Sequence, residues 1–220
     1  MKKQLLLFLI FCYSFSYSQL AIIKDKDGYT NVRKENSSKS KIIYKLKENQ
    51  AFWYNDTADK EWVEIYIPKD KFCINQNDDS YISGYIHKSR LQPIQSLSKP
   101  LPQEINFNYK FKKFEKLNHI NDGDETFVSR IDGKKIWGTD GNFPAIEIEK
   151  ISLFIDNKRI LIHEVLFNNL YECNGKINFF KKENTYFIYQ LNSDGAGTYE
   201  LLWVIDKEKG VKQRLVGTHI

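Results

Sequence analysis

The sequence has 220 residues, of which 41% are hydrophobic and 28% are charged, and its formal net charge at pH 7 is +5. This length is enough for one large domain or two small ones, each with a buried core. The weak positive charge argues against a nucleic-acid-binding protein, because phosphate backbones are bound through a concentrated basic face.

The first eighteen residues have the composition of a secretory signal peptide. Lys2 and Lys3 precede an apolar run from Leu5 to about Tyr13, and small residues stand before the predicted cleavage point near Ser18. The run is shorter than the ~20 residues that a membrane-spanning helix needs. The pattern therefore predicts a periplasmic or secreted protein that keeps no transmembrane anchor after cleavage.

The excess of basic residues belongs to the first half of the exported chain. Five lysines lie close together in sequence there, namely Lys34, Lys39, Lys41, Lys45 and Lys47. A solvated strand face is the ordinary interpretation of such a run. The sharper alternative is a weak anionic partner such as a cell-wall polymer.

Two cysteines, Cys73 and Cys173, follow the predicted signal peptide. In an oxidising compartment they form a possible disulfide that would close a loop of about a hundred residues. Two buried or free thiols are the alternative. Neither these cysteines nor the four isolated histidines have the close spacing of a zinc site, and we expect no metal and no cofactor.

The chain is predicted to be all-β, with two antiparallel parts. Short runs of alternating, β-branched and aromatic residues recur throughout, among them WVEIYI, KISLFI, YFIYQL and YELLWVI. Asp132-Gly133, Asp156-Asn157 and Lys182-Glu183-Asn184 separate such runs and predict hairpin turns. No window has the length and periodicity of a major helix.

A break in the pattern divides the predicted strands into two domains. The segment QPIQSLSKPLPQE, residues 92 to 104, holds three of the five prolines and no apolar periodicity. Proline fixes φ and donates no backbone hydrogen bond, so the segment favours an extended linker. We expect a barrel at residues 19–93, a linker at 94–104, and a sandwich-like or open-barrel domain at 105–220.

The first domain carries an ordered set of short motifs. Thr30-Asn31-Val32-Arg33 follows Gly28, Trp62-Val63 lies in a later strand, and Gly84-Tyr85-Ile86 precedes Leu91. In this order the motifs resemble the bacterial SH3 domain over about residues 20–93, which implies a small five-stranded barrel. The loop after Arg33 lacks the usual Gly and Pro, and Asn49 stands where the family has Gly. Asn still suits the positive φ of that turn.

The aromatic stretch at residues 52–54 supplies the candidate binding groove of this domain. Strand alternation puts Phe52 and Tyr54 on one face and Trp53 on the other. If Phe52 and Tyr54 fill the barrel, Trp53 points to solvent or to the neighbouring domain. Exposed aromatic rings anchor peptides and saccharides, so Tyr29, Trp53 and Tyr81 are candidate ligand contacts. Packing of Trp53 across the domain interface is the equal alternative.

Two Asp-Gly loops distinguish the second domain. Asp140 lies in WGTDGNFP, residues 137 to 144, and Asp194 lies in NSDGAGTYELLWVI, residues 192 to 205. If the loops meet, they could form a cation, sugar or peptide site in which glycine lets the backbone approach the ligand. Turn chemistry alone is the simpler interpretation. The two stretches are similar to secreted β-domains of uncharacterised function, which implies no activity.

The function predicted from these features is binding without catalysis. The resemblance to bacterial SH3 domains implies recognition of a peptidoglycan peptide or an envelope protein. Such domains also accompany cell-wall hydrolases, so the alternative is a hydrolase that uses Cys173 with His163 or His219. Cys173 lies in YECNGK, a polar turn with no helix N-terminus to activate a thiol.

Overall fold

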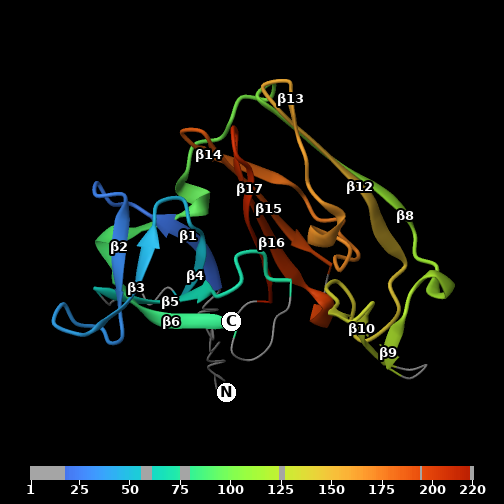
Figure 1. Ribbon diagram of the computed structural model, residues 1–220, viewed down its shortest axis with the longest axis horizontal. Helices are drawn as coiled ribbons and strands as arrows, with labels where there is room; N and C mark the ends of the chain where they lie inside the picture. Colours follow the sequence, from blue (N-terminus) through green and yellow to red (C-terminus); the bar gives the residue numbers. More distant parts are fainter. Residues whose placement is uncertain (1–17, 56–60, 75–79, 124–126, 194, 219–220) are drawn as a thin grey trace, which may run out of the picture.

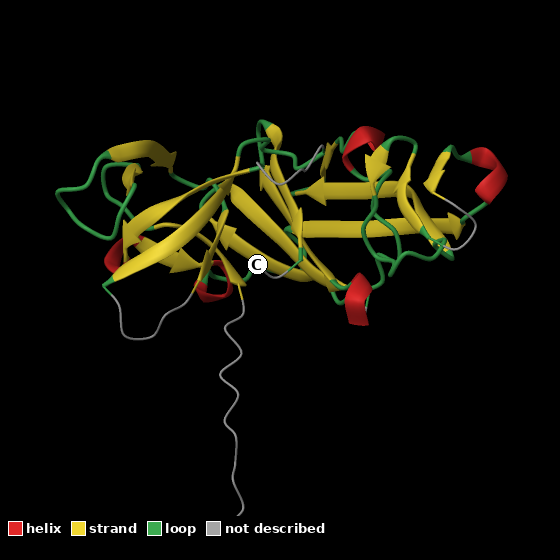
Figure 2. Ribbon diagram, turned by 90° about the horizontal axis from the view of Figure 1, so that it is seen from below, coloured by secondary structure: helices red, strands yellow, loops and turns green. Residues whose placement is uncertain are grey.

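The structure, a computed structural model, describes residues 18–55, 61–74, 80–123, 127–193 and 195–218. Antiparallel strands dominate it, as Figures 1 and 2 show, so the all-β prediction is confirmed. Helices in the described ranges are confined to five 3-10 turns, and none could span a membrane. These turns are η1 (Lys88–Arg90), η2 (Ile94–Ser96), η3 (Lys116–Asn118), η4 (Glu164–Leu166) and η5 (Gly195–Gly197). The predicted signal peptide lies outside the described residues except for Ser18.

The first half of the chain forms one seven-stranded sheet in the order β3-β2-β6-β5-β4-β1-β7. Its strands are β1 (Ser18–Ile23), β2 (Tyr29–Arg33), β3 (Ile42–Lys47), β4 (Phe52–Asn55), β5 (Trp62–Pro68), β6 (Tyr81–His87) and β7 (Leu91–Pro93). β2 meets β6 at the pair Arg33–Tyr85. The Thr30–Arg33 motif lies within β2, and Gly84–Ile86 lies within β6.

This sheet encloses a core of its own. Val32, Phe52, Tyr54 and Ile86 are at most 1% exposed and belong to one cluster. The alternation predicted for residues 52–54 is confirmed, because Trp53 leaves this cluster and joins a second, larger one. Both faces of β4 are therefore buried.

Three further sheets form the second half of the chain. Their strands are β8 (Ile105–Lys113), β12 (Ile146–Ile155) and β13 (Lys158–Ile160) in one sheet, β9 (Asn121–Gly123), β10 (Val128–Ile131) and β11 (Lys134–Lys135) in another, and β14 (Asn178–Lys182), β15 (Thr185–Asn192), β16 (Tyr199–Asp206) and β17 (Gly210–Gly217) in the third. The three predicted hairpin turns are confirmed, and Asp132, Asp156, Asn157 and Glu183 have positive φ there.

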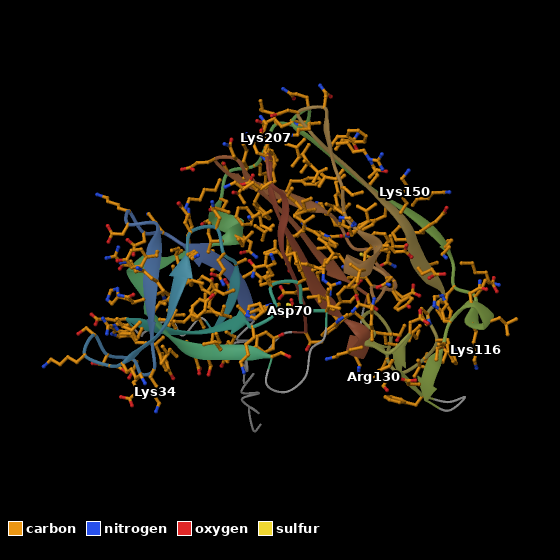
Figure 3. The ribbon with its side chains drawn as sticks, in the orientation of Figure 1. Lys34, Asp70, Lys116, Arg130, Lys150 and Lys207 are labelled. Carbon is orange, nitrogen blue, oxygen red and sulfur yellow. The ribbon has the colours of Figure 1, made fainter. Side chains whose placement is uncertain are left out.

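The four-stranded sheet lies between the seven-stranded sheet and the sheet of β8, β12 and β13, as Figure 1 shows. On β16, Glu200 faces the N-terminal sheet and bonds Trp53, whereas Tyr199 faces the opposite side and bonds the Tyr171 carbonyl. Side chains fill the space on both faces of this sheet (Figure 3). Seven of the eight residues of β16 are consequently buried.

The segment predicted as an extended linker is part of the packing instead. Ile94 is fully buried, Leu97 is 8% exposed, and both belong to the larger core cluster. Ser98 forms an isolated bridge with Lys181 of β14. The prolines do keep residues 94–104 out of regular sheet, but the two apolar side chains fix the segment against the second half.

Candidate functional site

Trp53 is not an exposed ligand contact, and that prediction is wrong. Its side chain is 0% exposed, and its Nε1 donates to Glu200 Oε2 at 3.3 Å. Tyr81 packs edge-on against the indole with ring centroids 5.6 Å apart, and Gly217 lies against the ring. The alternative interpretation, in which Trp53 packs across the junction of the two halves, is the one that the structure shows.

The predicted aromatic groove is therefore not assembled. Tyr29 lies on β2 with the Lys45 Nζ 3.4 Å from its ring centroid, whereas Tyr81 packs against Trp53. Tyr29 and Tyr81 are each partly exposed, but no described contact joins them to a shared surface. The loss of Trp53 removes the flat apolar anchor on which the prediction depended.

The cysteines are free thiols, so the possible disulfide is absent from this structure. Each sulfur lies against a different segment: the Cys73 Sγ near the Asp70 carbonyl at 3.6 Å, and the Cys173 Sγ near Gln190 Oε1 at 3.8 Å. Burial raises the pKa of the Cys173 thiol to about 11. A thiol that stays protonated is a poor nucleophile, which weakens the alternative of a Cys173-based hydrolase.

His119 has a structural role in the second half of the chain. The His119 ring lies between two carboxylates, with Nδ1 2.8 Å from Asp132 Oδ2 and Nε2 3.3 Å from Glu147 Oε2. Phe114 stacks on the ring at 4.7 Å between centroids. Contacts of this kind hold η3 onto the neighbouring strands.

The two Asp-Gly loops do meet. Asp140 lines a hollow that residues 193 and 197 also line, and the Ser193 Oγ donates to the Gly138 carbonyl at 2.9 Å. Asp194 lies outside the described residues. Close contact with a neighbouring backbone, and not turn formation alone, requires glycine at positions 138 and 197. A Cβ on Gly197 would lie 3.1 Å from the Thr139 carbonyl carbon.

A second hollow lies where the N-terminal sheet meets the four-stranded sheet, and we call it the junction groove. Its volume is about 500 Å³. It is lined by Tyr44, Lys47, Glu48, Asn49, Gln50, Pro68, Lys69, Lys71, Thr185, Val204, Asp206, Lys212 and Gln213. Grooves between packed units are a common place for ligands, because two rigid surfaces shape them.

Hydrogen bonds between the halves hold the inner wall of the junction groove. The Gln213 side chain donates to the Ala51 carbonyl at 2.9 Å and accepts from the Ala51 N–H at 2.8 Å. The Asn49 Nδ2 donates to Thr185 Oγ1 at 3.2 Å. The Asn49 Oδ1 is shielded from solvent and has no partner. A buried acceptor without a donor is costly.

The outer wall of the groove includes a short loop that a buried arginine holds in place. Arg214 is 0% exposed, and its guanidinium donates to the carbonyls of Phe72 and Cys73 at 2.6 and 2.7 Å. Burial lowers its pKa to about 10. Asp70 accepts from two N–H groups of the same loop, so its carboxylate is already occupied. Figure 3 labels Asp70 at the boundary between the halves.

The junction groove has an excess of positive charge. Four of its residues are exposed lysines, and within the described ranges none of them forms an ion pair: Lys47, Lys69, Lys71 and Lys212. Its two carboxylates have other partners, because Glu48 pairs with Lys182 at 2.9 Å and Asp206 Oδ1 accepts from two backbone N–H groups. Lysines that converge on a concave surface raise the local concentration of anions.

Sequence reasoning found only part of this site. Lys47 belongs to the run of lysines in the sequence, and Asn49 is the residue predicted for the turn. Lys69, Lys71 and Lys212 carried no local signal, because Lys212 is far from the other two in sequence and meets them only through the fold. Comparisons with protein-family models, with curated proteins and with solved structures find no match.

Proposed function

We propose that this chain is an exported, non-enzymatic binding protein of the cell envelope. Residues 19–93 act as a module similar to bacterial SH3 domains, and they recognise a cell-wall peptide or an acidic segment of an envelope protein. The ligand lies in the junction groove, where this module supplies most of the lining. The carboxylates of the ligand face Lys47, Lys69, Lys71 and Lys212.

The observation that carries this proposal is the set of four lysines on one concave surface, none of which forms an ion pair with a described residue. Four like charges repel one another. The electrostatic energy of this group of lysines becomes favourable only when counterions or an anionic ligand are present. Peptides of the bacterial cell wall carry several carboxylates.

Binding is favoured over hydrolysis by the state of the candidate nucleophile. Cys173 is 1% exposed and does not line the junction groove. Its raised pKa keeps the sulfur protonated at neutral pH. Among the described residues of the groove there is no Cys, His or Ser that could serve as a nucleophile or its base.

Sedimentation with purified cell-wall sacculi tests the proposal. The full protein should bind, and Lys69→Glu combined with Lys212→Glu should weaken binding by roughly tenfold or more, because each exposed charge contact contributes about 0.2–1 kcal/mol and reversal adds repulsion. Lys150→Glu is the matched control, since Figure 3 places Lys150 on β12, away from the N-terminal half.

Equal loss in the control and in the groove variant would contradict the proposal, and so would retention by both. Binding should also fall as the salt concentration rises, because exposed charge contacts are screened over about 10 Å at 0.1 M salt. Photo-crosslinking in cells from a probe at position 69 separates the two ligand classes. A discrete protein adduct indicates an envelope protein, whereas adducts with muropeptides indicate the cell wall.

A further inference from the structure

The hollow between the Asp-Gly loops is a second concave site, and we call it the two-loop hollow. Its volume is about 460 Å³, and it shares no residue with the junction groove. Three separate chain segments line it with Gly138, Thr139, Asp140, Asn142, Phe143, Ala145, Glu172, Asn174, Ser193 and Gly197. It therefore depends on the fold of the second half and not on the lysines discussed above.

The backbone around the two-loop hollow is held in unusual conformations. Gly138 has φ 107°, which suits glycine, but Glu172 and Ser193 also have positive φ, at 48° and 60°. Neither of these two residues lies in a two-residue hairpin turn. For residues other than Gly, Asn and Asp, such a backbone conformation costs about 1–3 kcal/mol of free energy. Residues held in this way are concentrated at ligand sites.

Specific contacts keep the hollow open and in shape. A Cβ on Gly138 would lie 2.1 Å from the Tyr171 carbonyl oxygen, so the two segments touch through their backbones. The Tyr199 hydroxyl donates to the same carbonyl at 3.0 Å. The Glu172 Oε1 accepts from the backbone N–H groups of Ala145 and Ile146 at 2.6 and 3.1 Å. The walls are thus formed before any ligand arrives.

The described part of the lining offers both hydrogen-bond donors and acceptors, and it includes no cationic side chain. Asp140 and Glu172 supply carboxylate oxygens, while Asn142 and Asn174 supply amides that can donate and accept. None of the described residues that line the hollow is Lys, Arg or His. The hollow therefore disfavours an anion and suits a neutral ligand rich in hydroxyl groups.

One shielded polar atom of the lining lacks a partner. Thr139 lines the hollow, and its Oγ1, which is shielded from solvent, has no hydrogen-bond partner. Such an atom costs stability unless a ligand or water reaches it.

We propose that the two-loop hollow is a saccharide-binding site. Its volume exceeds what one ion needs, and within the described residues no cluster of three metal-ligating side chains exists. Carboxylates and amides together match the alternating donors and acceptors of sugar hydroxyls. Phe143 and Ala145 supply an apolar part of the lining for the ring carbons. The site operates independently of the junction groove.

Titration of the full protein with neutral sugars tests the proposal. The probes are glucose, galactose, mannose, N-acetylglucosamine and lactose. Binding of each sugar is followed through amide chemical shifts in NMR spectra. At least one sugar should shift signals from residues 138–145 and 172–174. Asp140→Asn and Thr139→Val should each weaken its binding by about tenfold, as expected for the loss of a hydrogen bond in a shielded site.

Asp122→Asn is the matched control, because Asp122 is an exposed carboxylate of the same half that does not line the hollow. It should bind the sugar like the unaltered protein. The proposal is overturned if no probe shifts these signals up to about 50 mM, a range in which weak single-sugar binding is still visible. It is also overturned if both hollow variants bind as the unaltered protein does, or if chelation of divalent cations abolishes binding.

Discussion

At the scale of single residues, Trp53 shows how one side chain joins the two halves. Its indole is buried in the larger core and donates to Glu200, although its neighbours in β4 fill the smaller core. We expect Trp53→Ala to lower the free energy of unfolding by about 3–5 kcal/mol, as for other buried aromatic residues. Urea denaturation followed by circular dichroism measures this change.

Tyr29→Ala is the control for Trp53, because Tyr29 is a partly exposed aromatic residue of the same sheet. Its removal should cost at most about 1 kcal/mol, mainly through lost contact with Lys45. Equal effects of the two changes would show that Trp53 is not a core residue. A binding defect without a loss of stability in Trp53→Ala would restore it as a ligand contact.

Arg214 is the second residue on which the junction depends. Its guanidinium donates to the carbonyls of Leu166, Phe72 and Cys73 and to the Asn169 side chain. Arg214→Ala leaves these buried acceptors without donors, and each unsatisfied group costs about 1–3 kcal/mol. We expect a loss of at least about 3 kcal/mol in chemical denaturation. Arg159→Ala, at an exposed arginine, should change little, and similar losses in the two variants would refute this role.

Single residues also show where sequence reasoning ends. Alternation in AFWY correctly assigned Phe52 and Tyr54 to one core, since the period of a strand is a local property. It could not decide whether Trp53 meets solvent or protein, because the answer lies in β16, far along the chain. Arg214 gave no signal either, because a charged residue in a strand normally indicates an exposed position.

At the scale of elements, the crossing of β2 and β6 requires a glycine. A Cβ on Gly84 would lie 2.7 Å from Val32 Cγ1 and 2.8 Å from the Arg33 carbonyl oxygen. We expect Gly84→Ala to cost about 2–3 kcal/mol through overpacking. Gly28→Ala meets no atom within 4 Å and should cost only about 1 kcal/mol, because its φ is 73°. Thermal unfolding of the two variants compares them, and a larger effect at Gly28 would contradict the crossing described here.

The elements themselves were largely predictable, whereas their contacts were not. Asp132-Gly133 and Asp156-Asn157 form the expected hairpins because their backbone preferences are local. The segment with three prolines was expected to be an extended linker, yet Ile94 and Leu97 are buried in the core. Nothing local distinguishes an apolar residue that packs from one that crosses a solvated linker. The junction groove is a property of that packing, so it could not be predicted either.

At the scale of the whole molecule, buried phenols and a buried thiol make stability depend on alkaline pH. Burial raises the pKa of Cys173 to about 11, and it also raises the pKa values of Tyr109, Tyr171, Tyr189 and Tyr199. These groups stay protonated in the folded state while the unfolded chain loses its protons. Their contribution is fully present below about pH 9 and is lost as pH rises above it.

Arg214 acts in the opposite direction, because its lowered pKa of about 10 makes the unfolded chain bind more protons above that pH. Burial also lowers the pKa of Lys134, so this base acts in the same direction, but the two bases are outnumbered by the five acids. We expect the free energy of unfolding to fall by several kcal/mol between about pH 9 and pH 11. The urea concentration at the midpoint of unfolding should fall with it. Denaturation curves at intervals over this range measure it. A constant midpoint would contradict the burial of these groups.

The shared core makes a final prediction about cooperativity. Leu20, Ile22 and Trp53 from the N-terminal sheet belong to the same cluster as the side chains of β15 and β16. An excised fragment of residues 19–95 would expose these apolar side chains to water, at a cost of about 25 cal/mol for each Å². We therefore expect the full protein to unfold in one transition, with tryptophan fluorescence and circular dichroism changing together. The fragment alone should unfold at a much lower urea concentration or aggregate. Two separate transitions in the full protein, or a fragment as stable as the whole, would show that the halves are independent domains.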